Sequence, residues 1–322
     1  MKARMMAIAA LLLGMQAAGQ QADWSEIVTK YEGEGFSGVV VQLDSSGVVA
    51  NYTAGYADFK AQTPITTDTR FRIGYLSELF TAVPVFQLID EGNFDLDTPI
   101  QLLMPQLAYP ALKGVTVNHL LTHTSGLPAG TLAFDERTPP MVTIRKLLKQ
   151  EEGRGKLGKY QHSTANYLIL GQLVQKYLMK NWEYVVEDNV IRDLGLTNTD
   201  EHERGQLIDN MAIGSVCDPQ GDCSAEAAYC VGNLHSAGCL FASAEDMATF
   251  FTAFSSGHWF DAELLKTSDT MARNKELGYP GILERSSQVF GFTCHVEIGL
   301  LVLANTNAPA VQGLVEALSK DN

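Results

Sequence analysis

The sequence has few basic residues for its length. Its 322 residues include 23 Lys and Arg against 37 Asp and Glu, which gives a formal net charge of −14 at pH 7. The densest basic stretches, IRKLLKQ and GRGKLGK, are typical of solvated helix and loop faces. Nucleic acids and anionic lipid surfaces attract extended basic patches. We therefore expect no nucleic-acid partner.

Long hydrophobic runs are also absent. A membrane-spanning helix needs about 20 consecutive apolar residues, and no stretch of this chain is long and apolar enough. The apolar stretch Met5–Met15 follows Lys2 and Arg4 and precedes the small residues Ala17–Gly19. That three-part layout is typical of a secretory signal. We therefore expect cleavage near residue 19 and a secreted or periplasmic protein without a membrane span.

Cysteine is scarce, and the C-x2-C pairs of zinc frameworks are missing. Four of the five cysteines, Cys217, Cys223, Cys230 and Cys239, lie close together. In an oxidising compartment they could pair in three ways, and the local pairs Cys217 with Cys223 and Cys230 with Cys239 would close short loops. Cys294 is left over as a buried small residue. The sequence predicts no metal site and no cofactor.

Apolar periodicity predicts strands at both ends of the chain and helices between them. Residues 36–59 indicate a β-hairpin, and GLLVLANTN indicates a buried strand followed by a helix, APAVQGLVEALSK. Helices are predicted over residues 76–91 with Gly92 at the C-terminal cap, and over 141–151, 165–180 and 244–254.

This order predicts one α+β domain over residues 20–322. An antiparallel sheet, completed by both termini and flanked by helices, would use roughly residues 24–75 and 235–322. A helical region, roughly 76–234, would be inserted between them.

Eight collinear segments carry a resemblance to a known family. They are FSGVVVQ, TRFRIG, LIDEGNFDLDTPIQLLMP, VTVNHLLTHTSGLP, NYLILGQLV, IRDLGLTNTD, SAGCLFASAEDMATF and GLLVLANTN. Their order resembles the serine β-lactamase-related family, which includes class C β-lactamases, penicillin-binding DD-peptidases and related esterases. HLLTHTSGLP is the most diagnostic of them.

The resemblance implies acyl transfer to a serine in an S-x-x-K motif at the start of a buried helix, with the lysine as proton acceptor. It also implies a Y-x-N motif in the helical region and a K-T-G or H-T-G motif on a sheet strand. Such chemistry needs an exposed hydroxyl, a base within hydrogen-bond reach and an oxyanion pocket of N–H groups.

The first motif is altered in this chain. FRIGYLSE places Tyr75 at the serine position and Glu78 at the lysine position. Ser77 does not replace the serine, because residues two apart on a helix diverge by about 200°. Pro84 lies inside the same predicted helix, where proline costs about 3 kcal/mol unless the helix kinks. Acyl transfer by the family mechanism is therefore not expected.

The other two motifs are altered as well. HSTANYLILG places His162 at the tyrosine and Thr164 at the asparagine. Counting back from the G-F pair at 291–292 places Arg285, Ser286 and Ser287 at the third motif, in a hairpin shorter than the family pattern. The resemblance implies that these positions share one cleft with Tyr75 and Glu78.

We favour a catalytically degenerate protein that binds a ligand or partner in the old cleft. Glu78 and Arg285 could pair there or clamp a zwitterionic ligand such as a peptidoglycan fragment, or the cleft could hold an acyl compound. The first alternative is an active esterase, β-lactamase or peptidase with an unorthodox nucleophile, such as Tyr75 with His162 as base and Glu78 as orienter. The second alternative is a purely structural envelope protein.

Three histidines lie outside these motifs. His119 and His123 are four residues apart, like helical zinc ligands, but within HLLTHTSGLP we interpret both as structural. His295 stands in a predicted strand and is interpreted as a surface or core residue.

Overall fold

The computed structural model describes residues 23–129, 138–201, 208–217, 223–225, 232–272, 282–289 and 291–320. The predicted signal segment, residues 1–19, lies outside the described residues.

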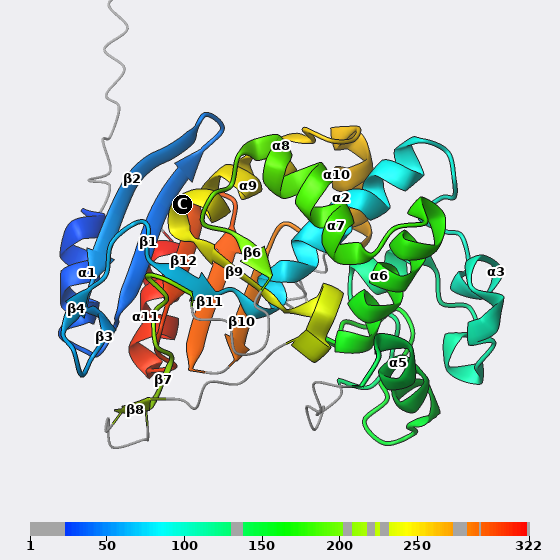
Figure 1. Cartoon of the computed structure of the whole chain (residues 1–322), viewed down its shortest axis with the longest axis horizontal. Helices are drawn as coiled ribbons and strands as arrows, with labels where there is room; N and C mark the ends of the chain where they lie inside the picture. The colour runs from blue at the N-terminus through cyan, green and yellow to red at the C-terminus, as the bar shows by residue number, and fades with distance from the viewer. Residues whose placement is uncertain are drawn as a thin grey trace, which may run out of the picture.

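The main sheet has five strands in the order β10-β11-β12-β1-β2, and all neighbours are antiparallel (Figure 1). Its strands are β1 (Gly38–Asp44), β2 (Gly47–Ala54), β10 (Arg285–Val289), β11 (Phe292–Glu297) and β12 (Leu300–Ala304). β1 pairs directly with β12, so segments from the two ends of the chain complete one sheet. The predicted fold class, the N-terminal hairpin and the C-terminal strand followed by a helix are thus confirmed.

The remaining strands are short. They are β3 (Tyr56–Asp58), β4 (Thr63–Pro64), β5 (Arg70–Arg72), β6 (Asp200–Glu201), β7 (Ser215–Cys217), β8 (Cys223–Ala225) and β9 (Leu240–Ser243). β5, β9 and β6 form a second small sheet beside the helical region.

Alternating side chains give the main sheet two apolar faces. Val40 and Val302 point toward α1 (Trp24–Glu32) and α11 (Pro309–Leu318), which cover the outer face (Figure 1). Val39, Val41, Leu301 and Leu303 belong instead to the large core shared with the helical region. This period of two follows from the pleat of a strand, and it buries both faces of the sheet.

Between β2 and β10 the chain forms the predicted helices and several shorter ones, from the helical region onward. The α-helices are α2 (Ser77–Asp90), α3 (Ile100–Leu103), α4 (Val117–Leu121), α5 (Pro140–Lys149), α6 (Thr164–Leu178), α7 (Trp182–Val186), α8 (Arg192–Leu194), α9 (Ala244–Ser256) and α10 (Ala262–Ala272). The 3-10 turns are η1 (Gly74–Leu76), η2 (Pro105–Leu107), η3 (Pro110–Leu112) and η5 (Gly232–Ala237), and η4 (Glu187–Ile191) is a π-helical turn.

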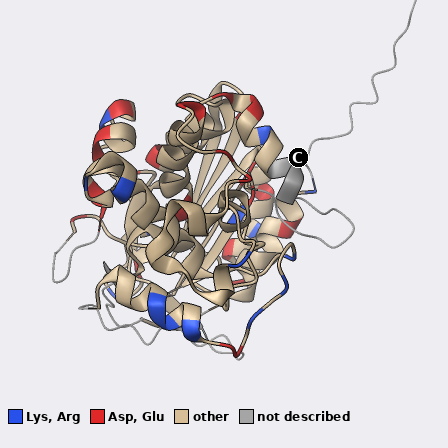
Figure 2. Cartoon of the chain, turned by 90° about the vertical axis from the view of Figure 1, so that its right-hand side faces the viewer, with Lys and Arg blue, Asp and Glu red and all other residues tan. Residues whose placement is uncertain are grey.

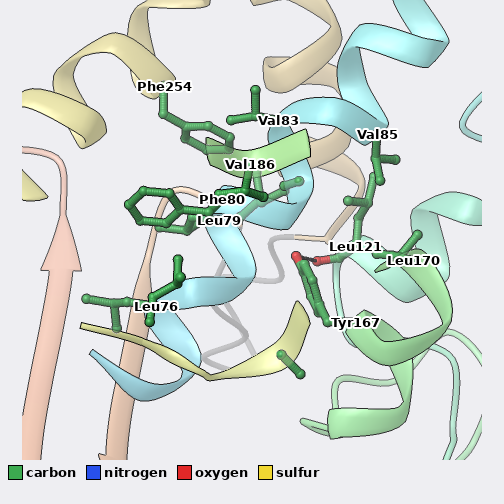
Figure 3. Packing of buried hydrophobic residues seen from close by; sticks show 14 of the residues in the cluster. Leu76, Leu79, Phe80, Val83, Val85, Leu121, Tyr167, Leu170, Val186 and Phe254 are labelled. Carbon is green, nitrogen blue, oxygen red and sulfur yellow. Dashed lines mark hydrogen bonds between the residues drawn. The ribbon is translucent and has the colours of Figure 1, made fainter. Parts of the chain in front are cut away.

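α2 is the central helix of this region, and almost all of its side chains are buried. Figure 3 shows Leu79, Phe80 and Val83 surrounded by side chains of other helices, and Phe80 stacks on Phe250 with ring centroids 3.7 Å apart. The helix continues through Pro84 and ends as predicted before Gly92, whose φ of +77° suits a C-terminal glycine. A helix buried on all sides fixes the position of its first turn, where the candidate site lies.

Among the described residues, no helix is long and apolar enough to cross a membrane. In the cartoon of Figure 2, acidic residues are scattered over many elements. Lys and Arg residues lie in a few separate places along the described part of the ribbon in this view.

Candidate functional site

The turn η1 brings the start of α2 against the edge strand β10. At Gly74, φ is +51°, and a Cβ atom there would lie only 2.3 Å from Ser287 Oγ. Glycine is therefore required both for the backbone conformation and for the close approach. The approach lets the Tyr75 backbone N–H donate a hydrogen bond to Ser287 Oγ at 3.0 Å. Tyr75 lies in η1, two residues before the start of α2, whereas Glu78 lies in the first turn of α2.

Glu78 is fully buried and is held by two histidines. Its Oε2 lies 2.9 Å from His123 Nε2, and its Oε1 lies 3.2 Å from His162 Nε2. The two imidazole rings face each other with centroids 4.3 Å apart. His162 also packs against the Tyr75 ring at 4.2 Å. A carboxylate and two imidazoles therefore form one compact cluster, with Tyr75 on its outer side.

The contacts of His123 define its protonation. Its Nδ1 faces the backbone N–H of Ser163 at 3.3 Å and the Asn166 side-chain amide at 2.9 Å. Asn166 Oδ1 accepts a hydrogen bond from the Ser125 hydroxyl, so its Nδ2 points toward the histidine. Nδ1 is thus an acceptor, and the proton of the neutral ring lies on Nε2, where it is donated to Glu78.

Burial and charge act in opposite directions on this cluster. Burial favours the protonated form of Glu78, but the charges and hydrogen bonds of His123 and His162 outweigh it and lower the pKa of Glu78 to about 2. Burial lowers the pKa of His123 to about 4, although Glu78 opposes the change. For Tyr75, burial raises the pKa above its ordinary value, and Glu78 adds to the increase. At neutral pH the cluster therefore holds an ionised carboxylate beside a neutral phenol.

A cleft of about 970 Å³ opens beside this cluster. Its lining includes Tyr75, Tyr160, His162, Ser286, His295 and Glu297. The cleft runs from η1 past the edge of the main sheet to α11.

The six positions that the resemblance implies divide into two groups. Tyr75, His162 and Ser286 line the cleft. Glu78 and Thr164 are buried behind its wall, where Thr164 hydrogen-bonds to the Tyr75 side chain.

Arg285, the sixth position, is also buried. Its Nη2 donates to the backbone carbonyl of Leu121 at 2.8 Å and to the Tyr167 hydroxyl at 3.2 Å. Figure 3 shows the Tyr167 hydroxyl pointing at Leu121, to whose carbonyl it also donates. Both oxygens of Glu78 contact histidines, and a clamp of Glu78 and Arg285 on a ligand stays a prediction.

Ser77 points away from the cleft, as predicted. Its hydroxyl accepts a hydrogen bond from the Leu240 backbone N–H at 3.2 Å. The side chain therefore connects α2 to β9 and takes no part in the cleft.

A second group of polar residues lies on the sheet side of the cleft. Ser286 in β10 stands opposite His295 in β11, and its Oγ lies 2.7 Å from His295 Nδ1. His295 Nε2 lies 3.7 Å from Glu297 Oε2, which is too long for a hydrogen bond. The hydroxyl, imidazole and carboxylate stand in the same order as in a hydrolase triad. Here, however, Nδ1 faces the serine and Nε2 faces the carboxylate, which is the reverse of the chymotrypsin arrangement.

His123 is the site residue that the sequence interpretation missed. The i,i+4 spacing suggested that His119 and His123 share a helix face, but α4 ends at Leu121 and His123 has a φ of +53°. His119 instead accepts a hydrogen bond from the Thr116 backbone in the capping box of α4. A helix end followed by T-S-G was the available signal that His123 had left the helix.

The cysteine predictions have mixed outcomes. Cys239 is a free, buried thiol, so the local pair of Cys230 with Cys239 is not formed. The side chain of Cys239 packs in the core, and Cys230 lies outside the described residues. The backbones of Cys217 and Cys223 stand opposite each other in the β7–β8 hairpin, but their side chains are not among those described, so their disulfide stays a prediction. Cys294 is free and buried, as expected.

Among the described residues, one group of three has the ligand atoms and the spacing to hold a metal ion: Glu78, His123 and His162.

Comparison with known proteins agrees with this fold. The profile of the Beta-lactamase family matches residues 24–285. Penicillin-binding protein 4* of Bacillus subtilis (strain 168) is 24% identical over 194 residues, which cover 57% of this chain and 42% of that protein. The chain spans about half the length of the curated relatives that it matches.

Solved structures show the same arrangement of elements. FmtA from Staphylococcus aureus has a TM-score of 0.73 and 19% identity, covering 92% of this chain and 88% of that one. A penicillin-binding protein homologue from Pyrococcus abyssi has a TM-score of 0.76 and 22% identity, covering 92% and 76%. Because the family profile covers most of the sequence and the five-stranded sheet and helical region match these folds, the chain belongs to the Beta-lactamase family.

Proposed function

We propose that this protein is an exported, catalytically degenerate member of the Beta-lactamase family that binds a small ligand in the former active-site cleft. The main support is the state of the first motif. The position of the base holds a buried carboxylate that is bonded to two histidines, and the position of the nucleophile holds a phenol. No serine and general base face each other there.

Two further observations support the loss of acyl transfer at this motif. The backbone N–H of Tyr75, at the position where a nucleophile's own N–H can stabilise an oxyanion, donates to Ser287 Oγ. The pKa of the Tyr75 phenol is raised by burial, whereas a nucleophilic tyrosine needs a lowered one. An attacking phenolate is therefore disfavoured.

The lining of the cleft supports a ligand with hydroxyl and amino groups. Tyr75 and Tyr160 offer aromatic rings, and Glu284, Glu297 and Glu316 place carboxylates along the walls. A peptidoglycan fragment with a free amino group matches this chemistry, and some relatives are named penicillin-binding proteins. An acyl compound is the other candidate ligand.

Thermal unfolding of the mature protein with defined muropeptides tests this proposal. We expect a muropeptide to raise the melting temperature of the wild type and to leave Ser286→Trp, which fills the cleft, unshifted. Leu102→Gln, at a residue exposed far from the cleft, serves as the control and should respond like the wild type. Equal shifts in all three proteins, or no shift in any, would contradict the proposal, and the latter result would favour a structural envelope role.

A hydrolase remains the second candidate function because of one observation, the 2.7 Å contact of Ser286 Oγ with His295 Nδ1 in the same cleft. Intact-mass spectrometry after incubation with a fluorophosphonate, a penicillin and an aryl ester separates the two functions. Binding without chemistry predicts no adduct on folded protein. An adduct that maps to Ser286 and disappears in Ser286→Ala would establish the hydrolase, and an adduct on Tyr75 would indicate the unorthodox tyrosine nucleophile.

Export forms part of the same proposal and rests on the N-terminal sequence. Expression in a bacterial host followed by cell fractionation and N-terminal sequencing tests it. We expect a mature protein that begins near residue 20 outside the cytoplasm. An intact N-terminus on protein confined to the cytoplasm would overturn the localisation.

A further inference from the structure

The cluster at the start of α2 has the dimensions of a metal site. The ligand atoms of Glu78, His123 and His162 all lie within 4.8 Å of one another, and the two hydrogen-bonded contacts measure 2.9 and 3.2 Å. Ligands at about 2.0–2.1 Å from a tetrahedral ion are separated by about 3.4 Å. An ion would therefore replace the two shared protons after the ligand atoms shift by up to about 1.4 Å relative to one another, from separations within 4.8 Å to about 3.4 Å.

The charge of the cluster favours a cation. Glu78 is fully buried, and its direct partners are two imidazoles, at 2.9 and 3.2 Å. Burying a carboxylate is costly unless a cation compensates it. The Arg285 guanidinium acts on Glu78 through space while its Nη2 is bonded to Leu121 and Tyr167. A divalent ion would supply the missing charge at the carboxylate itself.

We propose that Glu78, His123 and His162 bind one divalent transition-metal ion, of which Zn²⁺ is the type, through the Glu78 carboxylate and the Nε2 atoms of both histidines. Two nitrogen ligands and one carboxylate suit Zn²⁺ and its first-row neighbours, whereas Mg²⁺ and Ca²⁺ prefer oxygen alone. The inference goes beyond ligand binding in the cleft and does not depend on it.

The surroundings of His123 can support such an ion. When Nε2 binds a metal, the ring proton moves to Nδ1, which then needs an acceptor. Rotating the Asn166 amide by half a turn presents its Oδ1 to His123 Nδ1 and its Nδ2 to Ser125 Oγ, with the same two neighbours at 2.9 and 2.7 Å. The long contact from the Ser163 N–H, at 3.3 Å, is the one that is lost.

The site would have one open position, on the cleft side. Glu78 and His123 are fully buried, whereas the side chain of His162 is 28% exposed and lines the cleft. An ion can therefore enter past His162, beside Tyr75. Three protein ligands and one open position are typical of catalytic rather than structural zinc sites.

Titration of chelator-treated, full-length mature protein with Co²⁺ and with Zn²⁺ tests the proposal. We expect one equivalent of Co²⁺ to bind with the intense visible bands of a four-coordinate ion that has nitrogen ligands, and Zn²⁺ to displace it. His162→Ala should weaken binding at least about tenfold, and His162→Asp should restore part of the affinity. His162 is the appropriate target because its exposure makes the variant tolerable for folding.

His258→Ala is the matched control, because His258 also contacts a carboxylate, Asp193 at 3.0 Å, but at the surface. We expect it to keep the affinity and the spectrum. Asn166→Asp gives a second readout, since a carboxylate that accepts the Nδ1 proton should tighten metal binding. If Asn166 only supported folding, Asn166→Asp would not change the affinity for the metal ion.

Two results would overturn the proposal. One is the absence of a stoichiometric Co²⁺ spectrum from folded wild-type protein. The other is binding that His162→Ala leaves unchanged, which would place the ion elsewhere, for instance at the half-buried pair of His235 and Glu183.

Discussion

The cleft has a histidine–carboxylate group on each side, and the two differ in burial. On the helix side, Glu78 is fully buried and lies 2.9 and 3.2 Å from two imidazoles. On the sheet side, Glu297 keeps 23% of its side chain exposed and lies 3.7 Å from His295, beside the exposed Ser286. The first has short carboxylate–imidazole contacts without a serine hydroxyl, and the second has a serine hydroxyl and a carboxylate 3.7 Å from the histidine. Within one cleft, the buried group is thus suited to hold an ion and the exposed group to contact a ligand.

The two groups should differ most in how much stability is lost when the carboxylate of each is removed. Glu78→Ala leaves two buried imidazoles without their partner and should lower the free energy of unfolding by about 3–5 kcal/mol. Glu297→Ala should change it by less than about 1 kcal/mol, because a partly exposed contact at 3.7 Å contributes little. Urea unfolding of both variants measures the difference, and equal losses would show that burial does not separate the two groups.

The pH dependence of stability should follow the buried group. The pKa of Glu78 is lowered from 4.5 to about 2, so its ionised form stabilises the fold above pH 4.5 and this contribution is lost as the pH falls toward 2. The pKa of His123 is lowered from 6.5 to about 4, so the unfolded chain takes up that proton first and stability already declines below pH 6.5.

Melting temperatures of chelator-treated protein between pH 7 and pH 3 test whether stability falls as the pH falls. The change in the pKa of Glu78 alone corresponds to a loss of unfolding free energy on the order of 3 kcal/mol. In Glu78→Gln the melting temperature should fall less steeply below pH 4.5 than in the wild type. In Glu297→Gln its dependence on pH should match that of the wild type. A Glu78→Gln curve as steep as the wild type would refute the assignment.

The two sides of the cleft are connected by the contact of η1 with β10, and Gly74→Ala should disturb it. Its Cβ would lie 2.3 Å from Ser287 Oγ, and the φ of +51° adds strain, so we expect a loss of about 2–3 kcal/mol. Gly92→Ala is the matched control, because Gly92 has a φ of +77° and open space around it, and should lose about 1 kcal/mol. Similar losses in thermal unfolding would mean that the close approach contributes nothing.

The smallest effect is expected at neighbouring serines of β10. Ser287→Ala removes the acceptor of the Tyr75 N–H, Ser286→Ala removes the hydroxyl that faces His295 Nδ1, and each should cost about 1 kcal/mol. Amide hydrogen exchange at Tyr75 sharpens the comparison, because only Ser287→Ala should speed it. Unchanged exchange in that variant would show that the hydrogen bond does not protect the amide.

Local patterns were sufficient to predict the frame of the molecule. The period of two around Val40 and Val302 predicts strands, and both strands lie in one antiparallel sheet. Gly92 and Ser243, a glycine and a serine at helix ends, mark the limits of α2 and α9. These features depend on backbone preferences and on which side chains avoid water, and both are properties of short segments.

Residue identity and local periodicity were enough to predict the sheet, the central helix and the presence of Tyr75 and Glu78 at the start of that helix. Which side chains meet in the site depends on the packing of distant segments. His123 reaches Glu78 because α4 ends two residues earlier and the chain turns with a positive φ. Arg285 donates to Leu121 and Tyr167, two residues far from it in the sequence. Contacts across 40 or more residues depend on how packed elements divide a limited set of donors and acceptors, and no local pattern specifies that division.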